Sequence, residues 1–159
     1  MKLLIVSDTH GRDGNLETAV MRESPFDMLV HCGDVEGREF FIEALAECPC
    51  TIISGNNDFF SDLPREDEIT LAGHRILVTH GHLYGVSMDL SMLVDEARDR
   101  GCDCVFFGHT HRPVIDEIDG ILVLNPGSLA FPRQRDHKFS YAVMELDENG
   151  GISAEIRYL

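Results

Sequence analysis

Seven side chains of types that bind metal ions stand directly after apolar stretches of this sequence. Each stretch has the length and composition of a buried strand, and ligand sites in open α/β sheets gather beyond such strand ends. Carboxylate, amide and imidazole groups together suit manganese, iron, zinc or magnesium. The seven residues are Asp8, His10, Asp34, Asn56, His80, His109 and His111.

Seven candidate ligands are too many for one tetrahedral zinc ion. They fit two metal ions about 3.5–4 Å apart that share a carboxylate, an arrangement that binds the attacking and leaving oxygens in phosphate ester chemistry. For His109 and His111 taken alone, a pair of surface histidines is an equal alternative. Glycine precedes Asp34, Asn56 and His109, and we expect it to let the backbone turn sharply at these crowded positions.

The first third of the chain alternates between predicted strands and predicted helices. Short apolar runs over 2–7, 27–32 and 51–53 predict buried strands, and amphipathic segments over 15–21 and 38–47 predict helices. This βαβαβ order is typical of parallel strands joined by right-handed crossovers. Because such strands end at one edge of a sheet, we expect the polar side chains that follow them to meet there.

The rest of the chain has a different rhythm. Residues 68–71 and 75–78 predict a hairpin, 87–100 predicts an amphipathic helix, and 104–107 predicts another buried strand. We therefore expect an α/β fold in which two mixed sheets pack face to face with helices outside, as a single domain over 1–159. Four further strands, with turns at Asp119-Gly120 and Asn149-Gly150, are expected to pair antiparallel: 114–118, 121–124, 140–146 and 152–158.

The composition argues against several classes of partner and location. The chain has 159 residues, is 43% hydrophobic and carries a net charge of −15. It has no run of Lys and Arg that would bind a polyanion, so we expect no nucleic-acid partner. The N-terminal segment predicts a strand rather than a signal peptide, and no apolar run is long enough to cross a membrane, so a cytoplasmic location is expected. Five cysteines without C-x-x-C spacing predict reduced, mostly buried thiols.

Five short motifs follow one another along the chain: Asp8-x-His10, Gly33-Asp34, Gly55-Asn56-x-Asp58, His80 and Gly108-His109-x-His111. Their order resembles that of the calcineurin-like metallophosphoesterases, and the resemblance covers residues 5–130. Two stretches, Thr79-His80-Gly81-His82 and Asn125-Pro126-Gly127-Ser128, point within this family to the small single-domain YfcE-like phosphodiesterases. The family fold is a four-layer α/β/β/α sandwich, which agrees with the two sheets expected above.

The resemblance also implies a cofactor and a reaction. Two divalent ions are expected, with manganese favoured and nickel, iron, zinc or magnesium as alternatives. A metal-bound or bridging hydroxide would attack the phosphorus of a small phosphodiester in line. Asp58 would not contact metal but would orient neighbouring imidazoles. The implied ligand sets are joined by Asp34 as a bridge: Asp8, His10 and His111 for the first ion, and Asn56, His80 and His109 for the second.

Asn57 departs from the family pattern. Many phosphatases of the family carry histidine there as a proposed proton donor to the leaving group, and an amide cannot act as a general acid. We therefore expect substrates whose leaving oxygen needs little protonation, or another donor. His82 is the nearest candidate in the sequence, with an orienting or surface histidine as the equal alternative. The candidate catalytic residues are thus Asp34, Asn56, Asp58 and His82.

Other histidines and arginines carry weaker signals. His31 lies within a predicted strand and is expected to be a hydrogen-bonded core residue, whereas His74 and His137 are expected to be solvated. Arg12 and Arg112 follow metal motifs and could bind phosphate through their guanidinium groups, with solvated surface arginines as the alternative.

Two other functions are compatible with the sequence. One is a scaffold protein of the same fold that binds metal and has little activity, but the full set of ligand types favours catalysis. The other is a phosphomonoesterase or a nucleotide pyrophosphatase, and the absence of histidine at position 57 argues against the first of these. The expected partner is a small phosphodiester substrate. Phe131, Arg133 and Arg135, in the loop after Asn125-Pro126-Gly127-Ser128, could shape the access of this substrate to the site. A homo-oligomer is left open.

Overall fold

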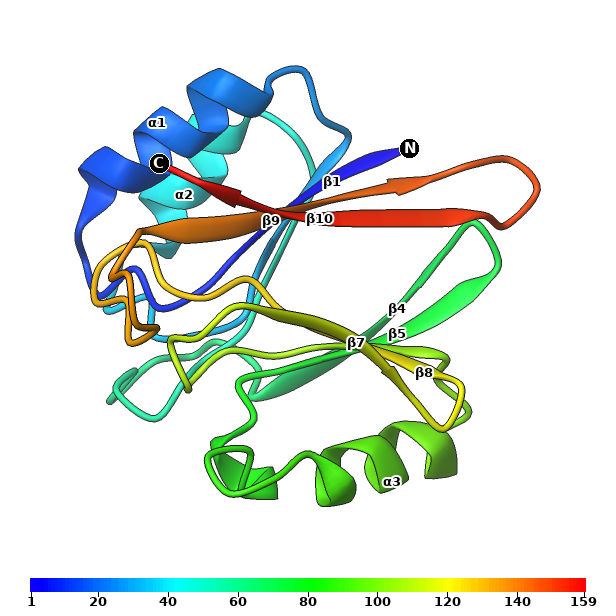
Figure 1. Ribbon diagram of the computed structural model, residues 1–159. Helices are drawn as coiled ribbons and strands as arrows, with labels where there is room; N and C mark the ends of the chain where they lie inside the picture. The colour runs from blue at the N-terminus through cyan, green and yellow to red at the C-terminus, as the bar shows by residue number, and fades with distance from the viewer.

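Two five-stranded sheets lie face to face in the computed structural model, and each carries helices on its outer face (Figure 1). All 159 residues are described. Helices α1 (Asp13–Glu23) and α2 (Glu39–Ala46) cover the first sheet, and α3 (Ser91–Asp99) covers the second. The four-layer α/β/β/α sandwich expected from the sequence is therefore confirmed. No helix is long and apolar enough to span a membrane.

The first sheet has the strand order β10-β9-β1-β2-β3. Strands β1, β2 and β3 run parallel, as the βαβαβ pattern predicts. The C-terminal hairpin extends this sheet because β9 pairs antiparallel with β1. The strands are β1 (Lys2–Val6), β2 (Met28–His31), β3 (Cys50–Ile52), β9 (Ser140–Leu146) and β10 (Ile152–Tyr158).

The second sheet has the strand order β4-β5-β6-β8-β7. The β4–β5 and β7–β8 hairpins are antiparallel, and so is the β9–β10 hairpin of the first sheet, which confirms the antiparallel pairing expected for the last four strands. β7 takes the edge of the sheet, and its hairpin returns β8 parallel to β6. The strands are β4 (Glu66–Leu71), β5 (His74–Thr79), β6 (Cys104–Phe106), β7 (Val114–Ile118) and β8 (Ile121–Asn125).

Side chains of β1 point alternately to the two faces of the first sheet. Leu3 and Ile5 belong to the apolar cluster between the sheets, whereas Leu4 and Val6 pack with helix residues such as Leu16. All five side chains are fully buried. A strand that is covered on both faces has no solvent side, which explains why it appears in the sequence as a continuous apolar run.

Helix α3 is shorter than the amphipathic pattern over 87–100 predicts. It begins at Ser91, where the Asp89 carboxylate accepts hydrogen bonds from the backbone amide and the hydroxyl of that serine. Residues 85–88 form turns, and a short 3-10 helix, η1 (His82–Tyr84), precedes them. The apolar spacing is confirmed by the buried face of α3, and the earlier part of the pattern lies in irregular backbone.

Candidate metal centre

The polar residues that follow the strands meet at one edge of the two sheets. The loops after β1, β2 and β3 carry Asp8, Asp34 and Asn56 from the first sheet, and the loops after β5 and β6 carry His80 and His109 from the second. In Figure 1 these loops lie together on the left, at the opposite end from the turns of the β4–β5 and β9–β10 hairpins. Two packed sheets therefore supply one site.

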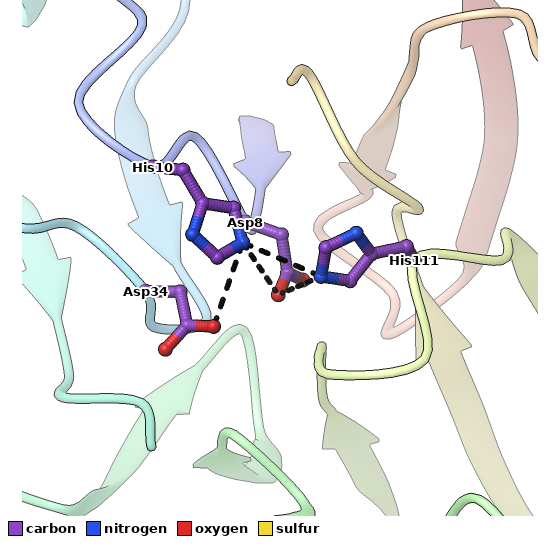
Figure 2. A group of neighbouring side chains, drawn as sticks. All are labelled: Asp8, His10, Asp34 and His111. Atoms are coloured by element: carbon purple, nitrogen blue, oxygen red, sulfur yellow. Dashed lines mark hydrogen bonds and ion pairs between the residues drawn. The ribbon is translucent and has the colours of Figure 1, made fainter. Parts of the chain in front are cut away.

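Four side chains form the best-defined cluster at this edge: Asp8, His10, Asp34 and His111 point toward one another (Figure 2). The Nε2 atom of His111 lies 3.0 Å from Asp8 Oδ1 and 3.4 Å from His10 Nε2. The Nε2 atom of His10 lies 3.6 Å from Asp34 Oδ2. Asp8 Oδ1 is buried and accepts no hydrogen bond. A buried carboxylate oxygen without a donor is costly unless a cation neutralises it, so this cluster fits a divalent ion.

A second group of ligand atoms lies beside the first. Asn56 Oδ1 lies 3.0 Å from His80 Nε2 and 2.9 Å from His109 Nδ1. His80 Nε2 in turn lies 3.5 Å from Asp34 Oδ2. The same carboxylate oxygen therefore stands at nearly equal distances from a histidine of each group.

Three of the imidazoles are held by the nitrogen that faces away from the centre. In each ring Nδ1 faces a carboxylate or carbonyl oxygen, which leaves Nε2 as the atom directed at the cluster. Such contacts fix the orientation of a ring and favour the tautomer that binds a cation through Nε2. The oxygens belong to Glu36 for His10, to the carbonyl of Cys32 for His80 and to the carbonyl of Phe131 for His111, each 2.7 Å from Nδ1.

The backbone at the ligand positions adopts a conformation that residues other than glycine rarely take. A left-handed φ in a residue with a Cβ costs about 1–3 kcal/mol and is concentrated at functional sites. The surrounding hydrogen bonds and packing must hold the chain in this conformation, so the directions of the ligands are fixed by the backbone itself. Five of the seven candidate ligands have φ between 46° and 65°: Asp8, His10, Asp34, His109 and His111.

Glycine stands beside these ligands mainly because the chain segments approach one another closely. A Cβ at Gly108 would come within 2.8 Å of Asp8 Oδ2, and a Cβ at Gly55 would collide with the carboxylate of Asp34. Neither glycine has a positive φ, so the sharp turn expected at all three glycines is found only at Gly33, with φ of 97°. At the other two positions glycine makes room for a carboxylate.

Opposite charges stabilise each other at the centre. Burial opposes ionisation of Asp34, but hydrogen bonds from His80 and Asn57 and the charge of His80 hold its pKa well below the usual range. Burial alone would lower the pKa of His80, and the carboxylates of Asp34 and Asp8 raise it above its usual value. A proton and a metal ion compete for the same imidazole nitrogen, so cation binding at His80 is expected to release a proton.

Comparison with known proteins agrees with this arrangement. Residues 1–149 match the family model of the calcineurin-like phosphoesterase superfamily domain. The chain belongs to this family. The calcineurin-like phosphoesterases use divalent metal ions, and the cluster of Asp8, His10, Asp34 and His111 offers ligands for one.

Individual relatives resemble the chain over nearly its whole length. The probable metallophosphoesterase YsnB of Bacillus subtilis is 37% identical over 161 residues, which cover 99% of this chain and 90% of the relative. The phosphodiesterase YfcE of Escherichia coli is 32% identical over 171 residues, which cover 92% and 89%. A conserved Streptococcus pneumoniae protein, described as a predicted phosphoesterase, has a TM-score of 0.81 at 26% identity and covers 99% of this chain and 97% of its own. The resemblance found in the sequence is confirmed.

Asn57 holds the carboxylate of Asp34. Its backbone nitrogen donates to Asp34 Oδ1 at 2.9 Å, and its side-chain Nδ2 donates to Oδ2 at 2.7 Å. The amide that cannot act as a general acid therefore has a positioning role, which the sequence did not indicate.

Asp58 holds backbone and not imidazole. Its carboxylate accepts hydrogen bonds from the amides of Val35 and Glu36 in the loop after β2, and from the amide of Gly55 in its own loop, at 2.6–3.1 Å. The expectation that Asp58 orients a neighbouring imidazole is therefore wrong in its detail. The strained loop of Asp34 offers unpaired backbone donors, and the carboxylate satisfies these instead.

His82 lies in η1 beside the second group of ligands. The centre of its ring is 5.4 Å from that of His80 and 6.1 Å from that of His109. Its Nδ1 atom is buried without a partner, and the side chain lines a cleft of about 420 Å³ together with Asn56 and Arg65. Burial and the charge of His80 lower the pKa of His82, so the ring is mostly uncharged at neutral pH. This argues against a protonated His82 as the proton donor at that pH.

The remaining sequence expectations for histidine and cysteine have mixed outcomes. His31 is buried, with Nε2 2.9 Å from the Thr9 hydroxyl, and burial lowers its pKa to about 4, so the prediction of a core histidine is confirmed. His137 is exposed as expected. All five cysteines are free thiols, and three of them are buried.

His74 is not solvated, so that expectation is wrong. Its Nδ1 lies 2.6 Å from the Asp103 carboxylate, and its Nε2 lies 2.9 Å from the carbonyl of Gly150 in the β9–β10 turn. The side chain is 16% exposed. A residue beside a hairpin turn is exposed only when no other segment packs against that turn. Here the β4–β5 turn of the second sheet contacts the β9–β10 turn of the first.

Glu36 and Ser128 support the centre, although neither was among its candidate residues. Glu36 contacts His10 as described, and the only signal in the sequence is its place two residues after Asp34. Ser128 donates to the carbonyl of Asp8 at 2.8 Å and accepts from the amide of Phe131, also at 2.8 Å. It thereby fixes the loop whose carbonyl orients His111.

Proposed function

We propose that this protein is a phosphodiesterase that hydrolyses small phosphodiesters with two divalent ions held between its sheets. The observation that carries the proposal is the place of Asp34. Its Oδ2 atom lies 3.6 Å from Nε2 of His10 and 3.5 Å from Nε2 of His80, between the two groups of ligand atoms. A shared carboxylate of this kind is typical of two-metal sites that act on phosphate esters.

The proposal gives each ligand a role. Asp34 would contact both ions, and Asp58 and Asn57 would keep its loop and carboxylate in place. The first ion would be held by Asp8, His10 and His111, and the second by Asn56, His80 and His109, as in the ligand sets implied by the family motifs.

Divalent ions at these positions would lower the pKa of a bound water and offset charge on phosphoryl oxygens. The side chains around the ions would supply orientation of the ligands and determine which leaving groups are accepted. The imidazoles are fixed by Glu36, Cys32 and Phe131, so little reorganisation accompanies substrate binding. Asn57 offers no proton to the leaving group and a mostly uncharged His82 offers little, so the site suits diesters whose leaving group is a stable anion.

The ligand types are compatible with several divalent ions. Carboxylate and amide oxygens mixed with imidazole, without thiolate, suit manganese, nickel, iron, zinc or magnesium, and manganese is the ion favoured by the family resemblance. Loading metal-stripped protein with each ion in turn, and assaying activated diesters, alkyl monoesters and cyclic nucleotides, tests the activity. Manganese-dependent turnover of the activated diesters is expected. Metal binding without turnover by any ion would contradict the proposal and favour a scaffold, and equal rates on alkyl monoesters would contradict the expected leaving-group preference.

The number of sites is tested by metal content rather than by rate. The His111→Ala variant is expected to lose mainly the ion of the first group, and His109→Ala mainly that of the second. Glu117→Ala, an exposed acid in β7, serves as the matched control and should keep both. Full occupancy of both sites in Asp34→Ala, or the loss of the same single ion from both histidine variants, would contradict two sites that share Asp34.

A further inference from the structure

Most arginines without an ion-pair partner lie near the candidate metal centre. Seven of the thirteen lysine and arginine side chains form ion pairs with Asp or Glu. Of the other six, Arg12 and Arg112 follow metal motifs, Arg65 lines a cleft with Asn56 and His82, and Arg133 lines a cleft with His10 and His111. These four come from separate parts of the sequence, so no basic run indicates them. The other two are Arg22 and Arg135.

Arg12 is held in place by stacking rather than by a charge partner. Its guanidinium lies over the ring of Phe131, 4.2 Å from the ring centre, and the same ring packs edge-on against the imidazole of His10. Phe131 is itself fixed, because its carbonyl bonds His111 and its amide bonds Ser128. A guanidinium stacked by its face keeps the donors of its edge, which are the donors that bind phosphate in pairs.

Arg133 follows Phe131 by two residues and lines two depressions. One is a cleft of about 610 Å³ that is also lined by Phe131, on which Arg12 stacks, and by His10 and His111 of the metal centre. The other is a cavity of about 480 Å³ that Arg133 shares with Arg112. The amide of Arg133 donates to the carbonyl of His111 at 3.0 Å, so the start of this side chain is tied to the metal motif.

The positive charge of Arg12 and Arg133 exceeds what is needed to balance the charge of a simple phosphodiester. A phosphodiester carries one negative charge, which divalent ions at the centre would already offset. In a chain of net charge −15, carboxylates are plentiful, yet neither Arg12 nor Arg133 forms an ion pair with one, although Asp89 lines the cavity that Arg133 shares with Arg112. An uncompensated group of like charges is stabilised by an anion, and guanidinium binds phosphate with particular specificity.

We propose that Arg12 and Arg133 form a subsite for a second phosphate group of the substrate, in the cleft beside His10 and His111. This inference rests on the proposed phosphodiesterase function and narrows it. The substrate class is an organic phosphodiester that carries an additional phosphate monoester, as nucleoside bisphosphate derivatives do.

A matched pair of substrates tests the subsite. The p-nitrophenyl ester of thymidine 5′-phosphate and the same ester with a 3′-phosphate share one leaving group and one reacting phosphorus. The 3′-phosphate is expected to raise kcat/KM roughly tenfold, mainly through KM, and this advantage should shrink as salt screens the charges. Equal kcat/KM values for the two esters would overturn the proposal.

Arginine variants show whether the preference comes from these side chains. In Arg12→Ala and Arg133→Ala the ratio of the two kcat/KM values should fall toward one. Arg22→Ala removes the same charge from an exposed arginine without a carboxylate partner, about 15 Å along α1 from Arg12, and should keep the ratio. An equal loss on both esters would mean that the arginines contact the reacting phosphate, which also overturns the assignment.

Binding to metal-free protein separates this inference from the proposed function. By titration calorimetry, thymidine 3′,5′-bisphosphate should bind roughly tenfold more tightly than thymidine 5′-phosphate, and Arg12→Ala should remove the difference. If no metal gives turnover but this difference is present, the phosphodiesterase proposal fails and the phosphate subsite stands. If turnover occurs but neither the rates nor the affinities respond to the second phosphate, the subsite fails alone.

Discussion

Asp58 gives the sharpest test of how the fold supports the centre. Hydrogen bonds to a charged acceptor each contribute about 1.5–3 kcal/mol, and the Asp58 carboxylate accepts from three backbone amides. Two of these belong to the loop in which Asp34 and Glu36 have φ of 59° and 55°. Because the amide of the exposed Glu36 regains water when the carboxylate is removed, we expect Asp58→Ala to lower the free energy of unfolding by about 3–5 kcal/mol, less than the full sum.

The asparagine variant separates the charge from the shape. In Asp58→Asn one oxygen can still accept from the amides of Val35 and Glu36, but an NH₂ group would face the amide of Gly55, donor against donor. A loss of about 1–3 kcal/mol is expected, the cost of one buried donor without a partner.

Urea unfolding in the presence of a chelator measures these losses without a contribution from bound metal. Metal titration of the same proteins should then show weaker binding by about 10–100-fold in Asp58→Ala, because the loop that carries Asp34 and Glu36 is no longer held. A loss of less than about 1 kcal/mol in Asp58→Ala, or wild-type stability in Asp58→Asn, would refute the argument that this carboxylate holds the loop.

Two further predictions concern stability away from the centre. The hydrogen bond with Asp103 raises the pKa of His74. The contacts of His74 with Gly150 and Asp103 should therefore stabilise the fold fully below about pH 6.5, and this stabilisation should be lost as pH rises through the raised pKa. In urea unfolding at several pH values, the free energy of unfolding should decline more steeply with pH for wild type than for His74→Gln, and parallel curves would contradict this prediction. Burial opposes ionisation of Glu23, but hydrogen bonds from Lys2, Tyr141 and Arg157 lower its pKa. Its contribution to stability is therefore present at neutral pH and lost as pH falls through that lowered pKa. Glu23→Ala should lower the free energy of unfolding by about 3 kcal/mol at pH 7, the lower end for a buried ion pair because Arg157 is partly exposed, and an unfolding midpoint equal to that of wild type would show that the pair makes no net contribution.

The sequence predicted the positions of the candidate ligands because one simple rule governs them. Polar residues that follow buried strands must lie at the edge of a sheet, and the strands were recognisable as apolar runs. The same rule says nothing of what holds each ligand. His80 and His111 are oriented by backbone carbonyls of Cys32 and Phe131, and every residue type has a carbonyl, so no sequence pattern could mark these two positions.

Long-range pairing was also beyond local patterns. The apolar spacing of β8 and β9 predicted strands, but their neighbours are set by how the chain crosses between the sheets. The expectation that His74 is solvated fails for the same reason, since its partner Gly150 lies 76 residues away. The stacking of Arg12 on Phe131 likewise depends on loops that only the fold brings together.

The position of β1 has a consequence for the order in which the molecule can be built. β1 is a central strand, flanked by β2 near the start of the chain and by β9 near its end. During synthesis one edge of β1 therefore stays without its partner until residues 140–146 emerge, and such unpaired edges invite association between chains. His109 and His111 also follow long after Asp8 and His10, so both the sheet and the metal centre are completed only when most of the chain is available. Slow, late acquisition of metal affinity during refolding is the expected kinetic signature of this topology.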